Sequence, residues 1–126
     1  MRDPRVGVDL VDVPAFEARL AGREDMLADI FTEAEIGYCR GQHSPWPHLA
    51  ARFAAKEALL KALSTGLTGA MRWRDIEVAR DPAGTPRLVV TGATAEALQR
   101  HRLAASSVSL SHTGTHAVAV VLLTTV

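Results

Sequence analysis

Residues 52–63, Arg-Phe-Ala-Ala-Lys-Glu-Ala-Leu-Leu-Lys-Ala-Leu, are the stretch of sequence that decides the fold. Alanine and leucine favour helix, and the pattern predicts a helix over 49–63 that stops at 65–66, Thr-Gly. At about 100° of rotation per residue, Lys56 falls inside the apolar stripe of this helix, with Arg52 one turn before it. A buried ammonium group is costly unless its stem reaches water or an anion pairs with it, and the sequence leaves both alternatives open.

Glu57 and Lys61 lie one helical turn apart on the border of the apolar stripe. Taken alone, they fit an ordinary surface ion pair. Of the 14 basic residues, however, only Lys56 and Lys61 are lysines and the rest are arginines. A genomic preference for arginine codons explains the excess of arginine but not the placement of both lysines in one helix. A site that needs a compact ammonium cannot accept a planar guanidinium instead, so this helix is the candidate location of the chemistry.

Residues 5–13, Arg-Val-Gly-Val-Asp-Leu-Val-Asp-Val, are rich in β-branched side chains and predict a strand. Strand alternation places Asp9 on an otherwise apolar face with Gly7, where a carboxylate needs a cation, a metal or donated hydrogen bonds. Gly7 leaves room either for a ligand or for close packing. Asp9 and Glu57 together offer oxygen ligands suited to Mg²⁺ shared with substrate phosphates, whereas a backbone-bonded Asp9 is the alternative.

The remaining pattern predicts an α+β fold in which an antiparallel sheet packs with helices. Thr32 and Glu35 form a capping box that starts a helix ending near Arg40. The other expected elements are a short helix over 15–20, a loop over 41–47, strands over 75–80 and 86–91 joined by a turn at 81–84, a helix over 93–102, and strands over 106–111 and 117–123 joined by a turn at 113–115.

Length and composition restrict the class of protein. The chain has 126 residues and zero net charge, which fits one domain over 1–126 and argues against nucleic-acid binding through bulk electrostatics. No apolar run is long enough to span a membrane, and residues 1–5 lead directly into the strand pattern with no signal-peptide segment. Cys39 is the single cysteine, so an intrachain disulfide is impossible. We expect a soluble cytoplasmic protein.

Ser111, His112 and Thr113 follow a predicted strand where it enters a turn, so their polar atoms and amides can face a phosphate. A structural histidine is the alternative. No Gly-x-Ser-x-Gly motif surrounds any serine, which excludes the usual serine hydrolase arrangement. The five histidines lack a recognised zinc-ligand spacing. Two carboxylates beside two lysines and Arg52 therefore indicate a pyrophosphate-handling site.

Four segments of the chain, in order, resemble the holo-acyl-carrier-protein synthase type of 4'-phosphopantetheinyl transferase. They are Gly-Val-Asp-Leu at 7–10, Arg-Phe-Ala-Ala-Lys-Glu-Ala at 52–58 with Lys-Ala at 61–62 and Thr-Gly at 65–66, Asp-Ile-Glu-Val at 75–78, and Ser-Leu-Ser-His-Thr at 109–113. The resemblance runs nearly end to end. It implies the 4'-phosphopantetheinyl transferase fold and transfer of 4'-phosphopantetheine from coenzyme A to a serine of an apo acyl carrier protein, with release of adenosine 3',5'-bisphosphate.

The resemblance also implies residue roles. Asp9 and Glu57 would hold Mg²⁺ against the pyrophosphate, and Glu57, directly or through a water on the metal, would accept the serine proton. Glu57 and Lys61 are the expected catalytic residues. The expected substrate-binding set is Arg52, Lys56, Lys61, Gly66, Ser111, His112 and Thr113. Members of this short type are usually homotrimers with sites between subunits, and coenzyme A and the apo carrier are the implied partners, without nucleic acid or membrane.

Two positions depart from the family pattern. Residues 14–16, Pro-Ala-Phe, stand where the family often has a basic residue followed by an apolar one for gripping the acidic carrier helix. Arg19 and Arg23 could serve instead if one helix carries both, or they could be ordinary solvated arginines. A polyketide or peptide-synthetase carrier is therefore as plausible as the fatty-acid carrier. Ser64 replaces a glycine common in the family's turn. A non-catalytic module that binds coenzyme A or carriers, and an interaction protein, are the competing hypotheses.

Overall fold

The computed structural model describes residues 4–126, apart from the side chain of residue 106. The expectation about the N-terminal segment rests partly on residues 1–3, which lie outside the described residues. In chain order the elements are β1 (Arg5–Asp12), α1 (Val13–Leu20), α2 (Glu24–Ile30), α3 (Glu33–Arg40), α4 (Pro45–Leu63), the short 3-10 helix η1 (Trp73–Asp75), β2 (Ile76–Arg80), β3 (Pro86–Val90), α5 (Gly92–Arg100), β4 (Leu103–His112) and β5 (His116–Thr125).

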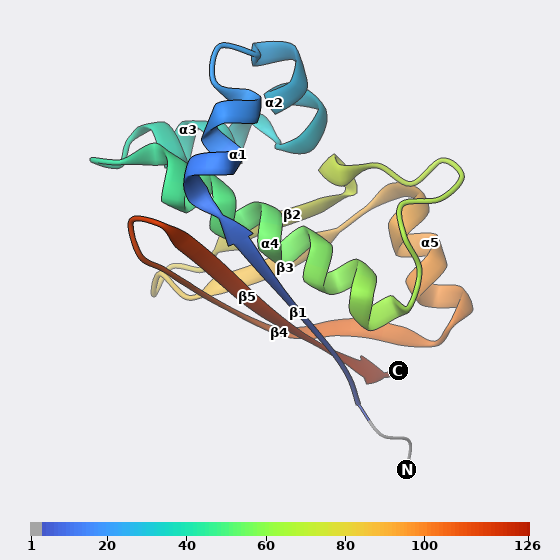
Figure 1. Ribbon diagram of the computed structural model, residues 1–126. Helices are drawn as coiled ribbons and strands as arrows, with labels where there is room; N and C mark the ends of the chain where they lie inside the picture. The colour runs from blue at the N-terminus through green and yellow to red at the C-terminus, as the bar shows by residue number, and fades with distance from the viewer. Residues whose placement is uncertain (1–3) are drawn as a thin grey trace.

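The strands form two antiparallel sheets around the long helix α4 (Figure 1). The first sheet has the order β1-β5-β4, and α4 lies across one of its faces. The second sheet is the β2–β3 hairpin, which lies next to β4 through β3. Helices α1, α2 and α3 gather at one end of α4, and α5 lies near its other end. The structure confirms the expected α+β class with antiparallel sheets.

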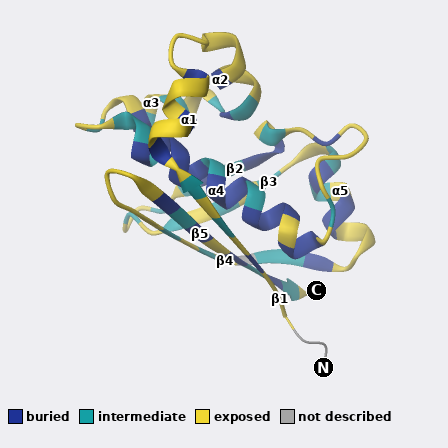
Figure 2. Ribbon diagram, viewed as in Figure 1, coloured by how far each residue is buried: buried dark blue, intermediate teal, exposed yellow. Residues whose placement is uncertain are grey.

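Helix α4 is buried along most of its length because it packs on the sheet, on β2 and on α1 and α3 (Figure 2). Small residues on it, such as Ala54, Ala55 and Ala58, have no exposed surface and allow its neighbours to approach closely. At the α1 end, the Phe16 ring packs on the rings of Phe31 and Phe53, with centroid distances of 6.4 and 5.3 Å. No helix within residues 4–126 is both long enough and apolar enough to cross a membrane.

Gly7 allows β1 to lie directly on the backbone of α4. A Cβ atom on residue 7 would lie 1.8 Å from the carbonyl oxygen of Ala58 and 2.8 Å from the amide nitrogen of Ala62. Of the two uses left open for this glycine, the structure therefore supports close packing rather than space for a ligand. This approach places Asp9, two residues along β1, on the side of the strand that faces α4.

The opposite face of the β1-β5-β4 sheet carries uncovered apolar side chains. Val6, Val8 and Leu10 on β1 are 65%, 55% and 65% exposed, and Val120 on β5, opposite Val8, is 40% exposed. Ser109 on β4 pairs with Val120 and continues the same face. This outer sheet face, defined by these five residues, is an apolar surface without a covering layer among the described residues.

Several elements differ from the sequence-based expectation, and the largest differences are in the helices. Helix α4 begins at Pro45, within the expected loop, because a proline is well tolerated in a first helical turn. Helix α1 begins at Val13 with the Asp12 carboxylate accepting from the amide of Ala15, so Pro14 opens a helix as well as ending the strand. Helix α2 was not expected at all. The capping box of Thr32 and Glu35 is confirmed.

Candidate functional site

Asp9 and Lys61 meet where β1 crosses α4. The ammonium nitrogen Nζ of Lys61 lies 2.7 Å from Oδ1 of Asp9 and 3.2 Å from the carbonyl oxygen of Val8. Lys61 is largely exposed whereas the Asp9 side chain is only 15% exposed, so the carboxylate is sheltered and the ammonium is accessible. Glu57 lies one turn before Lys61 on the same border of α4. Three of the expected site residues therefore converge.

The charges of these three residues are coupled. Partial burial raises the pKa of Glu57, the Asp9 charge raises it further, and Lys61 opposes both effects. The hydrogen bond to Asp9 and the two nearby carboxylates raise the pKa of Lys61. A carboxylate held near another carboxylate gains stability from a cation between or beside them. The Asp9–Glu57–Lys61 cluster thus presents Glu57, whose ionisation is disfavoured, beside the Asp9 carboxylate and one accessible ammonium.

The residues fit a magnesium ion by their chemistry. Within residues 4–126, no group of three or more His, Cys, Asp or Glu side chains is arranged to hold a metal. Mg²⁺ is usually bound by one or two carboxylates together with substrate phosphates. Asp9 and Glu57 can supply these two carboxylates. Burial raises the pKa of the Cys39 thiol to about 11, so this group remains protonated at neutral pH and offers no thiolate ligand or nucleophile.

Lys56, expected to bind substrate phosphates, is instead in the protein interior. Its side chain has no exposed surface, and its Nζ lies 2.8 Å from Oε1 of Glu35, which is equally buried. Lys56 also donates to the carbonyl oxygens of Trp73 and Ile76. Of the two alternatives that the sequence left open for Lys56, the structure shows pairing with an anion, and that anion is Glu35. The ammonium does not reach water, because its hydrogen bonds go to buried groups of the protein. The pKa of Lys56 is lowered, with burial as the main cause and Glu35 opposing it.

Glu35 is a buried residue that the sequence identified only as part of a helix cap. One oxygen of its carboxylate accepts from the amide of Thr32 and from Lys56, and the other accepts from the amide of Val78. This single side chain therefore joins α3, α4 and β2. The sequence did predict a buried lysine, Lys56, that needs an anion. It did not indicate that Glu35 is the carboxylate that pairs with Lys56.

Arg52 belongs to a second group of polar residues on α4. Its guanidinium carbon lies 4.5 Å from the centroid of the Tyr38 ring, and its Nη1 donates to the carbonyl oxygen of His48 at 3.3 Å. The His48 ring in turn packs edge-on against the His112 ring, with centroids 4.6 Å apart. The structure thus brings two expected site residues, Arg52 and His112, together through His48.

The two groups lie on opposite flanks of α4. Arg52 and Lys61 are nine positions apart, which corresponds to about 180° around a helix. The Lys61 flank faces β1, and the Arg52 flank faces α3. The residues expected to bind phosphates therefore do not converge within one chain.

Ser111 and Thr113 flank His112 at the end of β4. A shallow hollow of about 110 Å³ is lined by residues that include Leu10, Ser111, His112 and Thr113. The hydroxyl of Thr113 accepts from the amides of Thr115 and His116 and so organises the turn between β4 and β5. This hollow adjoins the outer sheet face at Leu10.

Gly66 follows α4 in an exposed turn, with open space around its Cα. Ser64, the residue that departs from the family pattern, ends α4 in the left-handed conformation with φ 65° and ψ 27°. Glycine reaches this conformation without strain, and serine does not. Serine in place of glycine at residue 64 therefore keeps the geometry of the turn, but the strained backbone of Ser64 costs some stability.

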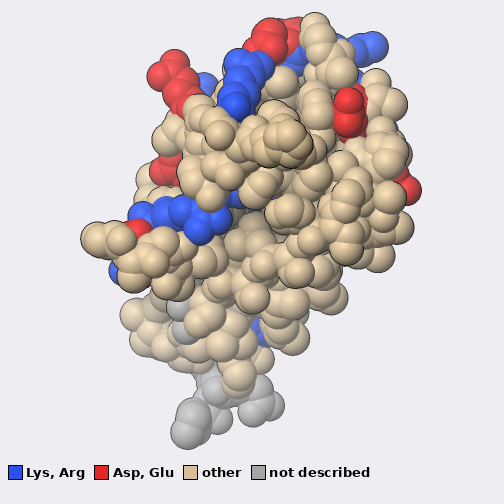
Figure 3. Space-filling view, turned by 90° about the vertical axis from the view of Figure 1, so that its left-hand side faces the viewer, with Lys and Arg blue, Asp and Glu red and all other residues tan. Residues whose placement is uncertain are grey.

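Arg19 and Arg23 do not share one continuous helix. Helix α1 ends at Leu20, Gly22 adopts a positive φ of 77°, and Arg23 precedes α2. The condition under which these two arginines would lie one turn apart, a single helix that carries both, is therefore not met. Figure 3 shows basic and acidic side chains mixed at the top of the molecule, over α1 and α2, rather than an uninterrupted basic surface. Glu24 pairs there with Arg40, Oε1 to Nη2, at 2.5 Å.

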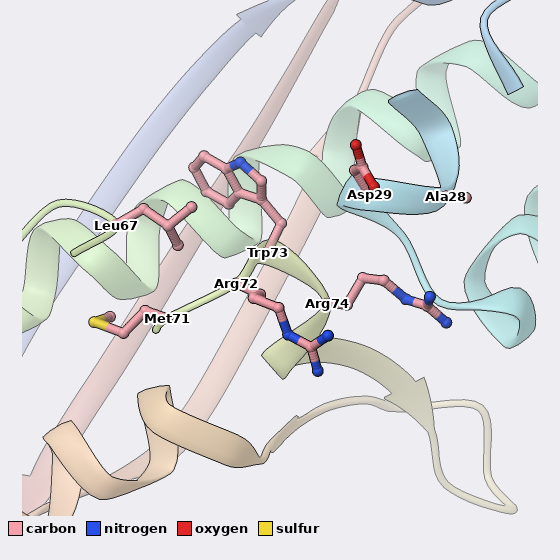
Figure 4. A pocket seen from close by; sticks show the side chains of 7 residues that line it. All are labelled: Ala28, Asp29, Leu67, Met71, Arg72, Trp73 and Arg74. Atoms are coloured by element: carbon pink, nitrogen blue, oxygen red, sulfur yellow. The ribbon is translucent and has the colours of Figure 1, made fainter. Parts of the chain in front are cut away.

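A pocket between α2 and the segment that follows α4 was not foreseen, because α2 was not expected. Its volume is about 330 Å³, and Figure 4 shows Trp73 pointing towards α4 while Arg72 and Arg74 extend away from it. Trp73 packs on Phe53 with ring centroids 5.2 Å apart, and Phe53 lies one turn before Glu57.

Comparisons with known proteins agree with this architecture. The family model of the 4'-phosphopantetheinyl transferase superfamily matches residues 5–121. The holo-[acyl-carrier-protein] synthase of Moorella thermoacetica is 40% identical over 116 residues, covering 92% of this chain and 90% of the relative. That of Syntrophotalea carbinolica is 44% identical over 117 residues, covering 92% and 91%.

Solved structures give the same result. An ACPS–CoA complex from Chronobacterium ammoniagenes superposes with a TM-score of 0.87 at 31% identity, covering 99% of both chains. The acyl carrier protein synthase of Mycobacterium tuberculosis is 41% identical with a TM-score of 0.70, covering 97% of both chains. The fold, the Asp9–Glu57–Lys61 cluster and these matches lead to one conclusion: the chain belongs to the 4'-phosphopantetheinyl transferase superfamily, in its holo-acyl-carrier-protein synthase group.

Proposed function

We propose that this protein transfers 4'-phosphopantetheine from coenzyme A to a serine of an apo acyl carrier protein, in an Mg²⁺-dependent reaction that releases adenosine 3',5'-bisphosphate. The observation that carries the proposal is the contact of Lys61 with Asp9, next to Glu57, where β1 crosses α4. A member of a coenzyme A-using family needs such a place for a diphosphate and a divalent ion. Residues 1–126 would act as one transferase domain, and the cytoplasmic location stays a prediction.

Asp9 and Glu57 would hold the magnesium ion. When bound, this ion would neutralise charge on the diphosphate and polarise its phosphorus–oxygen bond. Both acids lie near an ammonium that can contact the non-bridging oxygens of the same diphosphate. Lys61 would thereby stabilise the negative charge that grows on the leaving phosphate during transfer.

Glu57 is the residue we assign as the acceptor of the serine proton. Its pKa is raised by burial and by Asp9, which brings the carboxylate closer to the basicity that a general base needs at neutral pH. The serine oxygen of the carrier attacks the phosphorus atom next to the pantetheine, its proton moves to Glu57, and the bond to adenosine bisphosphate breaks.

The chain would act as a homotrimer with sites between subunits. Two observations support this proposal. The outer sheet face exposes Val6, Val8 and Leu10 and is an apolar surface that a second copy could cover. In addition, Arg52 and Lys61 lie on opposite flanks of α4, so one ligand could contact both groups only if they come from different copies.

The carrier would dock on the α1–α2 end, near Arg19 and Arg23. The mixture of charges there fits a carrier whose acidic helix presents a specific pattern rather than uniform negative charge. A polyketide or peptide-synthetase carrier therefore remains an alternative to the fatty-acid carrier. Ser111, Thr113 and Gly66, all in exposed positions, would line the nucleotide path.

Intact-mass spectrometry on a panel of apo carriers tests the proposal directly. Each carrier is incubated with the protein, coenzyme A and Mg²⁺, and we expect at least one to gain the mass of phosphopantetheine. The gain should require both Mg²⁺ and coenzyme A. Asp9→Asn should abolish most of it, while Glu96→Gln, an exposed change on α5 away from the proposed docking surface, should not. Tight coenzyme A binding without modification of any carrier would instead identify a non-catalytic binding module.

A further inference from the structure

The Lys61 ammonium is bonded to a carboxylate that is expected to bind the divalent ion. Its Nζ lies 2.7 Å from Oδ1 of Asp9 and 3.2 Å from the carbonyl oxygen of Val8. Glu57 is near enough that the charges of Asp9 and Lys61 both shift its pKa. One of the two oxygen atoms that Asp9 offers to a metal is therefore already bonded to a cation of this chain.

The ammonium and a divalent ion would repel each other if both stayed on this oxygen. Mg²⁺ binds oxygen ligands at about 2.0–2.1 Å. With Nζ at 2.7 Å from the same atom, the two cations would be at most about 4.8 Å apart. Water screens this repulsion incompletely, because the Asp9 side chain is only 15% exposed. Metal binding at Oδ1 therefore requires the ammonium to move away.

Of the three residues in the cluster, Lys61 is the one with freedom to move. Its side chain is 55% exposed and has a long flexible stem, so the ammonium can reach other positions in solvent. Asp9 pairs with Ala119 of β5 and lies two residues from the close contact at Gly7. Glu57 lies within the 19-residue helix α4. Secondary structure thus fixes the backbone of both acids, and the ammonium is the mobile part.

A displaced ammonium needs another anion. A lysine that leaves Asp9 for water alone loses an ion pair, which makes metal binding weaker than the two carboxylates by themselves would allow. The diphosphate of coenzyme A supplies an anion, since phosphate oxygens accept charge-assisted hydrogen bonds from ammonium groups. The same diphosphate offers oxygen ligands to the metal. Donor and metal would then each remove an obstacle to the binding of the other.

We propose that Lys61 is a displaceable counter-ion of Asp9, and that its ammonium leaves Oδ1 for the diphosphate of the donor when Asp9 and Glu57 take up the divalent ion. The inference rests on the proposed function, which supplies both ligands. Without donor, Lys61 keeps the affinity of the two acids for divalent ions low. With donor bound, Lys61 no longer competes. Metal and donor therefore bind with positive coupling, and by linkage each raises the affinity for the other by the same factor.

Binding of Mn²⁺ to the protein alone tests the competition without any transfer. Mn²⁺ prefers the same oxygen ligands as Mg²⁺, and its free concentration is measured by electron paramagnetic resonance. Lys61→Met removes the competing cation and should lower the Kd for Mn²⁺ on the order of fivefold, the effect of losing one exposed ion pair. Lys61→Arg keeps a cation at this position and should bind Mn²⁺ about as weakly as the wild type.

The matched control is Arg87→Met, which removes one positive charge at an exposed position on β3. Strand β3 lies beside β4, whereas β1 forms the opposite edge of the first sheet (Figure 1). This variant should leave the Kd for Mn²⁺ unchanged.

The same measurement with coenzyme A present, and without a carrier so that no transfer occurs, gives the coupling between donor and metal. We expect coenzyme A to lower the Kd for Mn²⁺ by a larger factor in the wild type than in Lys61→Met, because only the wild type has an ammonium to displace. Equal factors in the two proteins would contradict the exchange of partners by Lys61.

Asp9→Asn keeps failure of this inference distinct from failure of the proposed function. If Asp9→Asn weakens Mn²⁺ binding but Lys61→Met does not strengthen it, the metal site stands and the competition is refuted. Weaker binding in Lys61→Met would show that Lys61 positions Asp9 for the metal instead of competing with it. Tighter binding in Lys61→Met supports the inference even if no carrier on the panel is modified.

Discussion

Nζ of Lys61 lies 2.7 Å from Oδ1 of Asp9, although 52 positions separate the two residues in the sequence. The contact joins the edge strand β1 to the middle of the fold at the point where Glu57 also lies. A charge pair between an exposed ammonium and a sheltered carboxylate adds little to stability. The contact instead fixes the position of the Lys61 ammonium beside the carboxylates of Asp9 and Glu57.

Replacing Lys61 should therefore affect activity far more than stability. Lys61→Met removes the cation that faces the diphosphate, and we expect kcat/KM for coenzyme A to fall roughly 100-fold or more. The midpoint of urea unfolding should barely change, because the side chain is largely exposed. Lys61→Arg should recover only part of the rate, since a planar guanidinium does not reproduce a compact ammonium. Full activity of Lys61→Met would show that this ammonium does not contact the diphosphate.

Glu57→Gln should stabilise the protein at neutral pH while it impairs transfer. The pKa of Glu57 is raised in the folded state, so folding disfavours the ionised carboxylate at every pH above that pKa. This cost disappears as the pH falls below the unfolded-state pKa, where the group is protonated in both states. The difference in unfolding free energy between variant and wild type, measured by urea titration at several pH values, should thus be positive at pH 7 and shrink towards zero in acid.

Lys56→Met should destabilise the fold strongly. It leaves the Glu35 carboxylate buried without its cation, and breaking a buried ion pair by removing one partner costs about 3–5 kcal/mol. The double variant Lys56→Met, Glu35→Leu should recover part of that loss, although the amides of Thr32 and Val78 still lose their acceptor. Chemical denaturation of the single and double variants gives the coupling energy. A stable Lys56→Met protein would contradict the importance of this pair.

Gly7→Ala should disrupt the packing of β1 on α4. The new Cβ would meet the backbone carbonyl of Ala58, which cannot rotate away, so β1 must shift as a whole. We expect a loss of at least about 3 kcal/mol of stability, or no folded protein. Gly114→Ala, in the turn after β4 with open space around it, is the control and should be nearly neutral. Thermal unfolding followed by circular dichroism separates the two.

Ser64→Gly should raise stability slightly. Serine at this position adopts a left-handed conformation that costs a non-glycine residue about 1–2 kcal/mol. Glycine removes the strain but adds entropy to the unfolded chain, so the net gain should be a few tenths of a kcal/mol up to about 1 kcal/mol. Ser64→Ala, which keeps the strain, should show no gain in the same urea titration.

The elements with strong local signals could be predicted from the sequence. The helix around Lys56, the Thr32 capping box and the turn at 81–84 follow from propensity, capping chemistry and turn residues. Helix α2 could not be predicted in the same way, because it has seven residues and no side-chain cap at its start. Its stability comes from contacts such as Leu27 with the core, which no local pattern reveals.

The candidate site was predictable in part for a similar reason. Asp9, Glu57 and Lys61 stood out because each interrupts an apolar pattern or repeats at helical spacing, and the close approach at Gly7 brings them together. Helical geometry placed Lys56 on the buried face. Its anionic partner Glu35 belongs to another helix, 21 positions away, so this pairing depends on tertiary packing and not on a local pattern.

The placement of the two lysines has a practical consequence for labelling. The chain contains no other lysine, and the Lys56 side chain has no exposed surface whereas that of Lys61 is 55% exposed. Apart from the α-amino group, an acylating reagent or a fluorescent ester should therefore react with Lys61 alone in the folded protein. A single covalent reporter could thus be attached beside Asp9 without introducing any substitution.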